Sequence, residues 1–305
     1  MSEYVQAIVK SDTGGFRFTD VQRPVRRTES DILIRVSNIS LNRGELDFPW
    51  ESDKPAGWDA FGIVIETSTD GQGPKIGERV LTWSFSGAWS QYRVVDRANV
   101  AIVPESVSAS VAAALPVAGL TALRSLRSLH LQPGQSLAVT GATGGVGHLL
   151  VQLAMHAGIK VSAVAHSQRG FDWLQASDVK PNEVLLAKEY PFEGTFDALV
   201  DTVGGDLLAH LLDNVVPNGT VLILGVASGQ VASIDTTILV SRGIDLISYK
   251  DYSPAGEDLK TLLTLVDEKI IKVYADNIGS WDKVIKQDFM HLLAPGKVTL
   301  NVPQD

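Results

Sequence analysis

A glycine-rich run at residues 139–147 limits what this chain can fold into more than any other stretch. It reads Val-Thr-Gly-Ala-Thr-Gly-Gly-Val-Gly, and a short apolar run leads into it from residue 136. The apolar positions of residues 146–157 fall on one face of a helix, and residues 160–165 predict a second strand. A strand, turn, helix and strand in this order bind a pyrophosphate on the first N–H groups of the helix. The residues expected to contact a dinucleotide there are Gly141, Ala142, Thr143, Gly144, Gly145, Val146 and Gly147.

The spacing of these glycines helps to distinguish a dinucleotide site from a mononucleotide site. It is Gly-x-x-Gly-x-x-Gly with one extra glycine, rather than the strict G-x-G-x-x-G of many dinucleotide sites. The lack of a Gly-Lys-Ser or Gly-Lys-Thr at the end of the run argues against a mononucleotide P-loop. A plain tight turn of an α/β protein remains the alternative interpretation.

Composition excludes several classes of protein. A length of 305 residues suffices for two domains. The net charge of -9 argues against a nucleic acid or an anionic membrane as partner. The chain has no cysteine, so neither a disulfide framework nor a thiolate metal site is expected. No apolar run reaches membrane-spanning length and no basic-then-apolar leader follows Met1, so we expect a cytoplasmic protein.

The strand and helix signals change in character along the chain. Up to about residue 110, short strand signals are broken by Gly and Pro, which is typical of a small β-barrel domain. From residue 136 to about 250, apolar strands alternate with helical segments, which predicts a parallel sheet covered on both faces. We place the domain boundary just before Val111, and expect a helix over residues 259–271 and a strand over residues 297–302.

Several blocks of the sequence match one family of enzymes in the right order. These blocks are residues 57–64, 87–92, 112–116, 119–122, 201–205, 219–221 and 296–298. With the glycine turn they resemble the zinc-free medium-chain dehydrogenase/reductases, in particular the quinone oxidoreductase branch, over nearly the whole chain. The resemblance implies an α/β protein with a Rossmann parallel-sheet domain and a GroES-like β-barrel catalytic domain.

The resemblance also implies the domain layout, a partner and further cofactor contacts. Residues 1–110 would form the first part of the GroES-like domain, residues 111–252 the Rossmann domain, and residues 253–305 a return helix and the rest of the GroES-like domain. The family is usually homodimeric, or tetrameric as paired dimers, through edge strands of the Rossmann sheets, here residues 244–247. Further expected cofactor contacts are Thr121, Val203, Gly204, Gly225, Val226 and Ala227.

The residues after the second strand of the turn unit bear on the choice between NADH and NADPH. NAD enzymes of this fold place an acid about 20 residues past the turn, on the ribose 2′-OH. Here the chain reads Ala-His-Ser-Gln-Arg from residue 165, with no acid before Asp172. A hydroxyl and a guanidinium suit a 2′-phosphate. We therefore predict NADPH, with Ser167 and Arg169 as contacts and His166 beside them; a solvated loop with an unrelated arginine is the alternative.

The expected chemistry is hydride transfer without a metal. The six histidines show no ligand spacing, so quinones and conjugated carbonyls such as enones are the expected substrates. Asn42 stands where the family has an Asn near the nicotinamide, although an ordinary turn Asn fits as well. The loop after it is shorter than in the family and lacks the family's tyrosine. Its Phe48 and Trp50 either stack on a flat substrate or belong to the core.

Three other functions compete with this one. A short-chain dehydrogenase is excluded because the turn lies far from the N-terminus and no Tyr-x-x-x-Lys is present. An enoyl or 2-alkenal reductase of the same fold is not distinguished from a quinone reductase by the sequence. A non-catalytic NADPH-binding sensor or scaffold also stays open, because binding and catalysis are separable.

Overall fold

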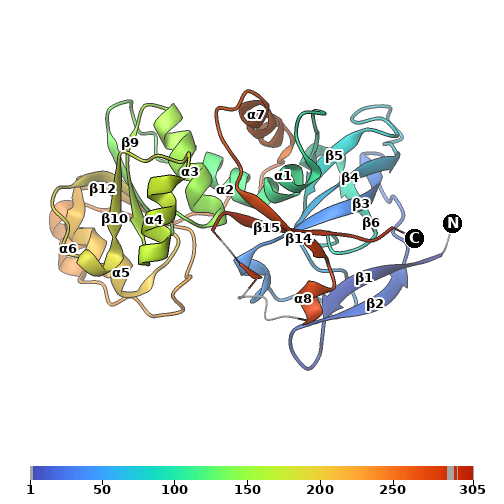
Figure 1. Ribbon diagram of the computed structural model, residues 1–305, viewed down its shortest axis with the longest axis horizontal. Coiled ribbons are helices and arrows are strands. Elements are labelled where there is room, and N and C mark those ends of the chain that lie inside the picture. The colour runs from blue at the N-terminus through green and yellow to red at the C-terminus, as the bar shows by residue number, and fades with distance from the viewer. Residues whose placement is uncertain (1–2, 287–291, 294, 305) are drawn as a thin grey trace. The chain divides into compact units, whose positions relative to one another are not determined.

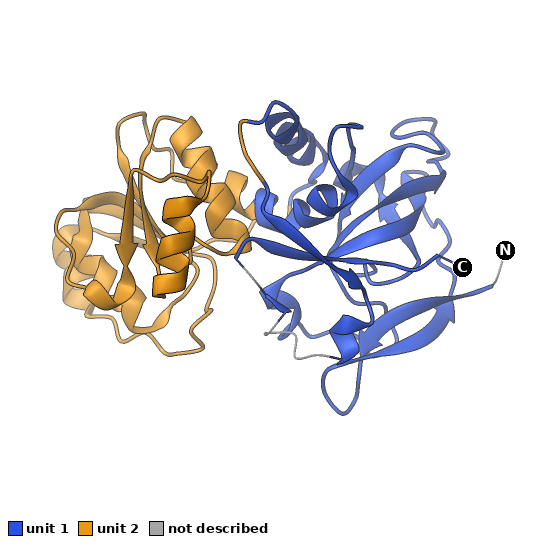
Figure 2. Cartoon of the chain, viewed as in Figure 1, with its two compact units in different colours: residues 1–120, 253–269, 273–305 blue, residues 121–252, 270–272 orange. Residues whose placement is uncertain are grey.

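The computed structural model describes residues 3–286, 292–293 and 295–304, which form two compact units (Figure 1). Unit 1 comprises residues 1–120, 253–269 and 273–305, and unit 2 comprises residues 121–252 and 270–272 (Figure 2). The first crossing lies inside helix α2 (Pro116–Ser128), later than the boundary expected before Val111. The reason is that helix α1 (Ala109–Ala114) packs against strands of unit 1 and belongs with them.

Unit 1 is built on a sheet with the order β14-β15-β3-β4-β5-β7, in which β6 also pairs with β3. A two-stranded sheet of β1 and β2 accompanies it. The strands are β1 (Tyr4–Lys10), β2 (Phe16–Gln22), β3 (Asp31–Leu41), β4 (Asp59–Glu66), β5 (Arg79–Trp83), β6 (Tyr92–Asp96), β7 (Val100–Ile102), β14 (Ala275–Ser280) and β15 (Lys297–Asn301). The helices are α1, α7 (Gly256–Asp267), α8 (Lys283–Lys286) and the 3₁₀ turns η1 (Arg43–Glu45) and η2 (Arg97–Asn99).

Strand β3 is the centre of unit 1. Its long run of buried apolar residues packs on both faces, which a strand enclosed in a barrel-like core requires. Strand β15, from the far end of the chain, pairs antiparallel with it and sets Val298 opposite Leu41 and Thr299 opposite Ser40. This pairing brings residue 297 next to the end of β3, where the loop toward η1 begins.

Unit 2 is a parallel sheet with the order β10-β9-β8-β11-β12-β13. Its strands are β8 (Ser136–Thr140), β9 (Lys160–Ala165), β10 (Glu183–Leu186), β11 (Phe196–Asp201), β12 (Val215–Ile223) and β13 (Asp245–Ser248). Its helices are the second part of α2, α3 (Gly145–His156), α4 (Gln168–Ala176), α5 (Gly205–Leu211) and α6 (Thr236–Arg242), with the 3₁₀ turns η3 (Ala187–Glu189) and η4 (Leu212–Asn214). The order reverses between the adjacent strands β8 and β11, and ligands of such sheets bind at the carboxyl ends of the strands beside that point.

The helices of unit 2 cover both faces of its sheet. Right-handed crossovers place α3 and α4 on one face and α5 and α6 on the other (Figure 1). Apolar side chains of α5 and α6 form one cluster with the sheet, including Leu208, Leu211 and Val221. The α/β fold class expected from the alternating signals is therefore confirmed.

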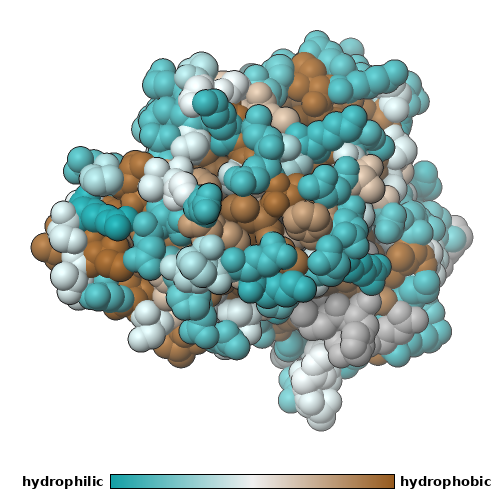
Figure 3. All heavy atoms as spheres, turned by 60° about the vertical axis from the view of Figure 1, so that its left-hand side comes forward, coloured by the Kyte–Doolittle hydropathy of each residue, from teal (hydrophilic) through white to brown (hydrophobic). Residues whose placement is uncertain are grey.

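Strand β13 is an edge of the unit 2 sheet among the described strands. Ile247 of this strand is 43% exposed, and Val240 of the preceding helix α6 is 84% exposed. Figure 3 brings the α6 side of unit 2 forward and shows apolar surface there between polar side chains. Of the helices in the described part of the chain, none combines the length and the hydropathy needed to cross a bilayer.

Candidate functional site

The glycine turn of unit 2 joins β8 to α3, and its backbone packs closely against neighbouring residues. Gly141 has a φ of 60°, and a Cβ atom there would lie 2.2 Å from Oγ1 of Thr202. The first intrahelical bond of α3 runs from the N–H of His148 to the carbonyl of Gly144 at 3.1 Å. The N–H groups of Gly145, Val146 and Gly147 precede it, and a helix N-terminus of this kind attracts an anion.

Polar side chains tie the carboxyl ends of β8 and β11 together. Thr140 donates from Oγ1 to Oδ1 of the buried Asp201 at 2.6 Å and accepts from the N–H of Thr202 at 3.0 Å. The other carboxylate oxygen of Asp201 accepts from the N–H of Gly204 at 2.7 Å. Burial raises the pKa of Asp201, against the hydrogen bond from Thr140. This network fixes the backbone at the point where the sheet order reverses.

The loops after β11 and β12 lie side by side. The N–H of Ala227 donates to the carbonyl of Thr202 at 3.2 Å. A Cβ on Gly225 would lie 2.9 Å from that same oxygen, so the approach needs glycine. Val203 is half-buried, and Val226 is 71% exposed. The structure therefore places these predicted contacts together at one end of the sheet, whereas Thr121 lies half-buried in α2 at the start of unit 2.

The residues predicted to select NADPH lie at the start of helix α4. Ser167 is its N-cap, and its Oγ accepts from the N–H of Gly170 at 3.2 Å. The hydroxyl hydrogen remains available as a donor because the cap uses only the oxygen. A Cβ on Gly170 would lie 3.2 Å from Cγ2 of Thr143, so the start of α4 lies against the glycine turn. His166 and Arg169 are exposed beside this cap.

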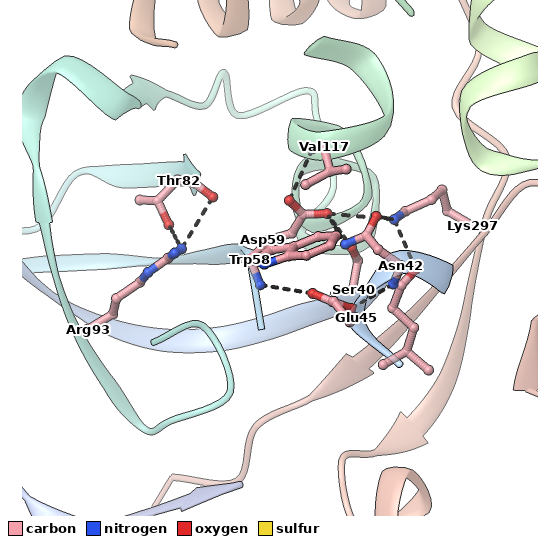
Figure 4. A network of polar contacts seen from close by, with 10 residues as sticks. Ser40, Asn42, Glu45, Trp58, Asp59, Thr82, Arg93, Val117 and Lys297 are labelled. Atoms are coloured by element: carbon pink, nitrogen blue, oxygen red, sulfur yellow. Dashed lines mark hydrogen bonds and ion pairs between the residues drawn. The ribbon is translucent and has the colours of Figure 1, made fainter. Parts of the chain in front are cut away.

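Unit 1 contains a second polar constellation, built around Asn42 (Figure 4). The Nζ of Lys297 donates to Oδ1 of Asn42 at 2.5 Å and to the carbonyl of Leu41 at 3.0 Å. The Nδ2 of Asn42 donates to Oδ2 of Asp59 at 2.9 Å, and Lys297 lies 3.6 Å from that oxygen. Asp59 also accepts from the hydroxyl of Ser40 at 2.7 Å. Asn42 is therefore enclosed within unit 1 by a base and an acid.

The backbone N–H of Val117 donates to Oδ1 of Asp59 at 3.0 Å, so both carboxylate oxygens of this residue are engaged. The Lys297 and Asp59 side chains are 4% and 0% exposed. Burial lowers the pKa of Lys297, and the charges of Asp59 and Glu45 oppose that shift. The attraction between Asp59 and Lys297 offsets part of the free-energy cost of removing each charge from water. A buried charge requires such a partner.

Glu45 closes the loop between η1 and β4. Its Oε2 accepts from the N–H of Asn42 at 2.7 Å, and its Oε1 accepts from the N–H of Trp58 at 2.9 Å. The Glu45 side chain is fully buried. Burial, followed by the charge of Asp59, raises the pKa of Glu45 to about 8. One carboxyl group thus joins both ends of the shortened loop.

Arg93 is a fourth buried ionisable residue in unit 1. The guanidinium of Arg93 donates to Oγ1 of Thr82 at 2.8 Å (Figure 4). It also donates to the carbonyl of Ser86 at 2.9 Å. Burial lowers the pKa of Arg93 to about 10. Two acids and two bases therefore lie inside unit 1.

Phe48 and Trp50 pack within the loop that Glu45 closes. Their ring centroids are 4.5 Å apart, and Phe48 meets the Trp58 ring edge-on at 5.3 Å. The indole N–H of Trp50 donates to the carbonyl of Glu45 at 2.7 Å, and Trp50 packs against the buried core of unit 1. These contacts favour the packing interpretation over stacking on a substrate.

Sequence reasoning did not single out Glu45, Asp59, Lys297 or the Thr140–Asp201 pair as site residues. The signal was present in part, because Asp59 and Lys297 each stand directly before an apolar strand segment. A charge at the start of a buried strand needs a partner in the core.

Comparison with known proteins places this fold in a family. A family model described as zinc-binding dehydrogenase matches residues 145–268. The mouse protein quinone oxidoreductase-like protein 2 is 26% identical over 267 residues, which cover 81% of this chain and 75% of that protein. YhfP of Bacillus subtilis, provisionally named a quinone oxidoreductase, is 30% identical over 247 residues, which cover 70% of this chain and 73% of YhfP.

Solved structures show the same fold. The quinone oxidoreductase of Coxiella burnetii superposes with a TM-score of 0.81 at 22% identity, covering 98% of this chain and all of that one. The mycobacterial protein Rv1454c, solved as a complex with NADPH, superposes with a TM-score of 0.86 at 24% identity, covering 97% and 99% of the two chains. The fold is that of the medium-chain dehydrogenase/reductases. Within that class, the chain belongs to the quinone oxidoreductase-like family, as the sequence blocks predicted.

The donor set does not fit a zinc ion. The chain has no cysteine, and the described residues contain no group of three or more His, Asp or Glu side chains that could hold a metal. Lys297 and Asp59 instead pair with each other, Glu45 accepts from backbone N–H groups, and Arg93 donates to a hydroxyl and to carbonyls. The zinc of the matched family model's description therefore has no counterpart among these residues.

Proposed function

We propose that this protein is an NADPH-dependent oxidoreductase that delivers hydride to a quinone or another conjugated carbonyl without a bound metal. Family membership supports the oxidoreductase activity. The observation that carries the choice of cofactor is the start of α4, which lies against the glycine turn at Gly170. It carries the Ser167 cap and the exposed Arg169, with no acid before Asp172. The NADPH complex of Rv1454c supports a nicotinamide cofactor of this kind.

Unit 2 offers groups that can bind the negatively charged phosphates of a dinucleotide. The first N–H groups of α3 would hold the pyrophosphate. The hydroxyl of Ser167 and the guanidinium of Arg169 would hold the 2′-phosphate through charge-assisted hydrogen bonds. Bound NADPH supplies a hydride, and the protein supplies its position.

The residues of unit 1 supply polar groups for the acceptor. The acceptor oxygen gains negative charge when hydride adds to a conjugated carbonyl or a quinone. Asn42 carries an amide N–H of the type that stabilises such an oxygen. In this proposal solvent, rather than a side chain of the described residues, supplies the proton to the acceptor oxygen.

Steady-state kinetics test the proposal directly. Purified protein is mixed with NADPH and, in separate assays, a 1,4-quinone, a simple enone and an enal, with NADH as the matched control cofactor. Rapid NADPH oxidation by the quinone, with slower turnover of NADH, is the expected result. Faster turnover with NADH would contradict the roles of Ser167 and Arg169.

A conjugated acyl acceptor is the second candidate. The chain is 32% identical over 219 residues to a segment of the phenolphthiocerol synthesis polyketide synthase of Mycobacterium marinum, 10% of that protein. Polyketide synthesis handles acyl chains, so turnover of the enone or enal rather than the quinone would identify an enoyl-type reductase. Tight NADPH binding without oxidation by any acceptor would instead favour the sensor or scaffold.

A further inference from the structure

The Lys297 ammonium lies among three fixed oxygen atoms. Two are the carbonyl of Leu41 and Oδ1 of Asn42, and the third is Oδ2 of Asp59. An ammonium only donates and an ionised carboxylate only accepts. The buried ammonium therefore has a full set of partners within unit 1.

This arrangement decides the orientation of the Asn42 side-chain amide. Its oxygen faces the donor-only group of Lys297 at 2.5 Å, and its nitrogen faces the acceptor-only group of Asp59 at 2.9 Å. A flipped amide would place N–H groups against the ammonium and an oxygen against the carboxylate. Both contacts would be repulsive, so one orientation is allowed.

Asp59 cannot turn to follow a flipped amide. Its Oδ2 also accepts from Ser40 at 2.7 Å, and its Oδ1 accepts from the backbone of Val117 at 3.0 Å. Asn42 itself is anchored through its backbone N–H to Glu45. The amide is therefore held from the oxygen side, the nitrogen side and the main chain.

We propose that Lys297 is a positioning residue, which with Asp59 locks the amide of Asn42 so that its second Nδ2 hydrogen is presented in one direction to the oxygen of the hydride acceptor. This inference rests on the proposed function and deepens it. The nitrogen carries two hydrogens, and among the described residues Asp59 accepts one of them. Lys297 acts through Asn42 and does not touch the acceptor.

The step that this hydrogen serves is the addition of hydride. A new C–H bond would form at the acceptor carbon as the C–H bond that carried the hydride in the reduced nicotinamide breaks, which would leave the cofactor oxidised. The electron pair of the broken π bond would move to the acceptor oxygen. A proton from solvent then neutralises that oxygen. A donor whose direction is already fixed stabilises the developing charge without reorganising during the reaction. Loss of Lys297 should therefore lower kcat more than it raises KM.

Lys297→Met removes the ammonium and keeps a side chain of similar length. We expect kcat with the quinone to fall about tenfold or more while KM for NADPH stays within about twofold. Thr299→Val is the matched control: Thr299 is buried on the same strand, and its hydroxyl contacts Ser110 at 2.6 Å, away from Asn42. The control should lose stability and keep kcat. Equal effects of the two variants on kcat would overturn the proposal.

A second variant guards against misfolding, because Lys297→Met leaves the Asp59 charge buried alone. Lys297→Met combined with Asp59→Asn removes both charges and should fold, yet still lose kcat. A double variant that folds and retains the wild-type kcat would overturn the proposal.

A spectroscopic readout separates this inference from the proposed function. Nitrogen-15 NMR follows the side-chain amide of Asn42, assigned by its loss in Asn42→Ala. In the wild type we expect one Nδ2 hydrogen to exchange slowly with solvent, and in Lys297→Met to exchange about tenfold faster or more. Unprotected hydrogens in the wild type would refute the lock. The Asn42 hydrogens could instead be protected in a protein that fails to oxidise NADPH with any of the acceptors. That result would refute the proposed function and the catalytic use of the lock.

Discussion

Gly147 lies in the first turn of α3 so close to Gly141 that a Cβ atom added to it would sit 2.3 Å from the Gly141 carbonyl oxygen. The same Cβ would lie 2.7 Å from the Cα of Ala142. The helix can begin directly over the turn only because residue 147 has no side chain. This contact determines where the first N–H groups of α3 point.

The variant Gly147→Ala should therefore damage cofactor binding. The methyl group must push α3 away from the turn, because backbone atoms cannot yield as a flexible side chain does. We expect the Kd for NADPH to rise roughly tenfold or more, about 1.4 kcal/mol. Isothermal titration calorimetry measures it. Leu150→Ala, a buried truncation on the same helix, is the control and should lower the melting temperature while leaving Kd within about twofold.

The cap of α4 allows a clean exchange of cofactor preference. Ser167→Asp keeps an oxygen that accepts from the Gly170 N–H, so the helix retains its cap. The new carboxylate would repel a 2′-phosphate and accept from a ribose 2′-OH. We expect the ratio of kcat/KM for NADPH over NADH to fall roughly tenfold to a hundredfold. An unchanged ratio would place the 2′-phosphate elsewhere.

Arg169→Ala tests the proposed contact between the Arg169 guanidinium and the 2′-phosphate. Arg169 is exposed, and its loss should cost little stability. We expect KM for NADPH to rise about tenfold and KM for NADH to stay the same. Arg127→Ala, on α2 in the same unit, serves as the charge-matched comparison and should alter neither constant.

Glu45 should make the stability of the protein depend on pH. Its pKa of about 8 in the folded chain exceeds the ordinary value of 4.5, so the folded state holds this proton more tightly than the unfolded state does. The stabilisation is complete below the unfolded pKa and is lost as the pH rises through the folded pKa. The slope for one proton is at most about 1.4 kcal/mol per pH unit.

Glu45→Gln replaces the protonated carboxyl with a neutral group of the same shape. The amide nitrogen of the variant cannot accept from a backbone N–H as both Glu45 oxygens do, so urea unfolding at about pH 4 should find the variant less stable than the wild type. Between that pH and about pH 9 the stability of the wild type should fall relative to that of the variant. Glu66→Gln removes one charge from a partly exposed ion pair with Arg26 and should show little of this dependence. An equal difference at both pH values would contradict burial as the cause.

We also propose that two copies of the chain pair through β13. An edge strand offers unpaired backbone groups, and Ile247 and Val240 are exposed beside it. Ile247→Lys should shift the sedimentation coefficient from a dimer to a monomer. Val25→Lys changes a valine that is 69% exposed in unit 1 and should leave the dimer intact. A monomeric wild type would end this proposal.

Local pattern was sufficient to predict the core of unit 2. The strands at β8, β9 and β13 and helix α3 are predicted close to where they lie, because apolar periodicity and glycine stops are encoded over a few residues. The β1–β2 pair and helices α4, α5 and α6 were not predicted. Helix α6, for example, is seven residues long, and its apolar residues Ile238 and Leu239 are only partly buried, so the segment is too short to show a helical period.

The polar network of unit 1 lay beyond such reasoning for a different physical reason. Asn42 was expected near the chemistry from family resemblance, but its partner Lys297 lies 255 residues away in the sequence. No periodicity links two such positions; only the pairing of β15 with β3 does. Glu45 is a charged residue in a polar loop, and nothing local shows that it is buried.

Unit 1 is assembled from both ends of the chain, and this arrangement affects the order in which the two units fold during synthesis. Residues 121–252 leave the ribosome as one continuous stretch and hold the whole parallel sheet of unit 2. Unit 1 must wait for β15, and until then the carboxylates of Asp59 and Glu45 have no ammonium of Lys297 beside them. The nascent chain would therefore complete the sheet of unit 2 before that of unit 1. A ribosome stalled before residue 297 would carry an incomplete unit 1 that still needs protection by chaperones.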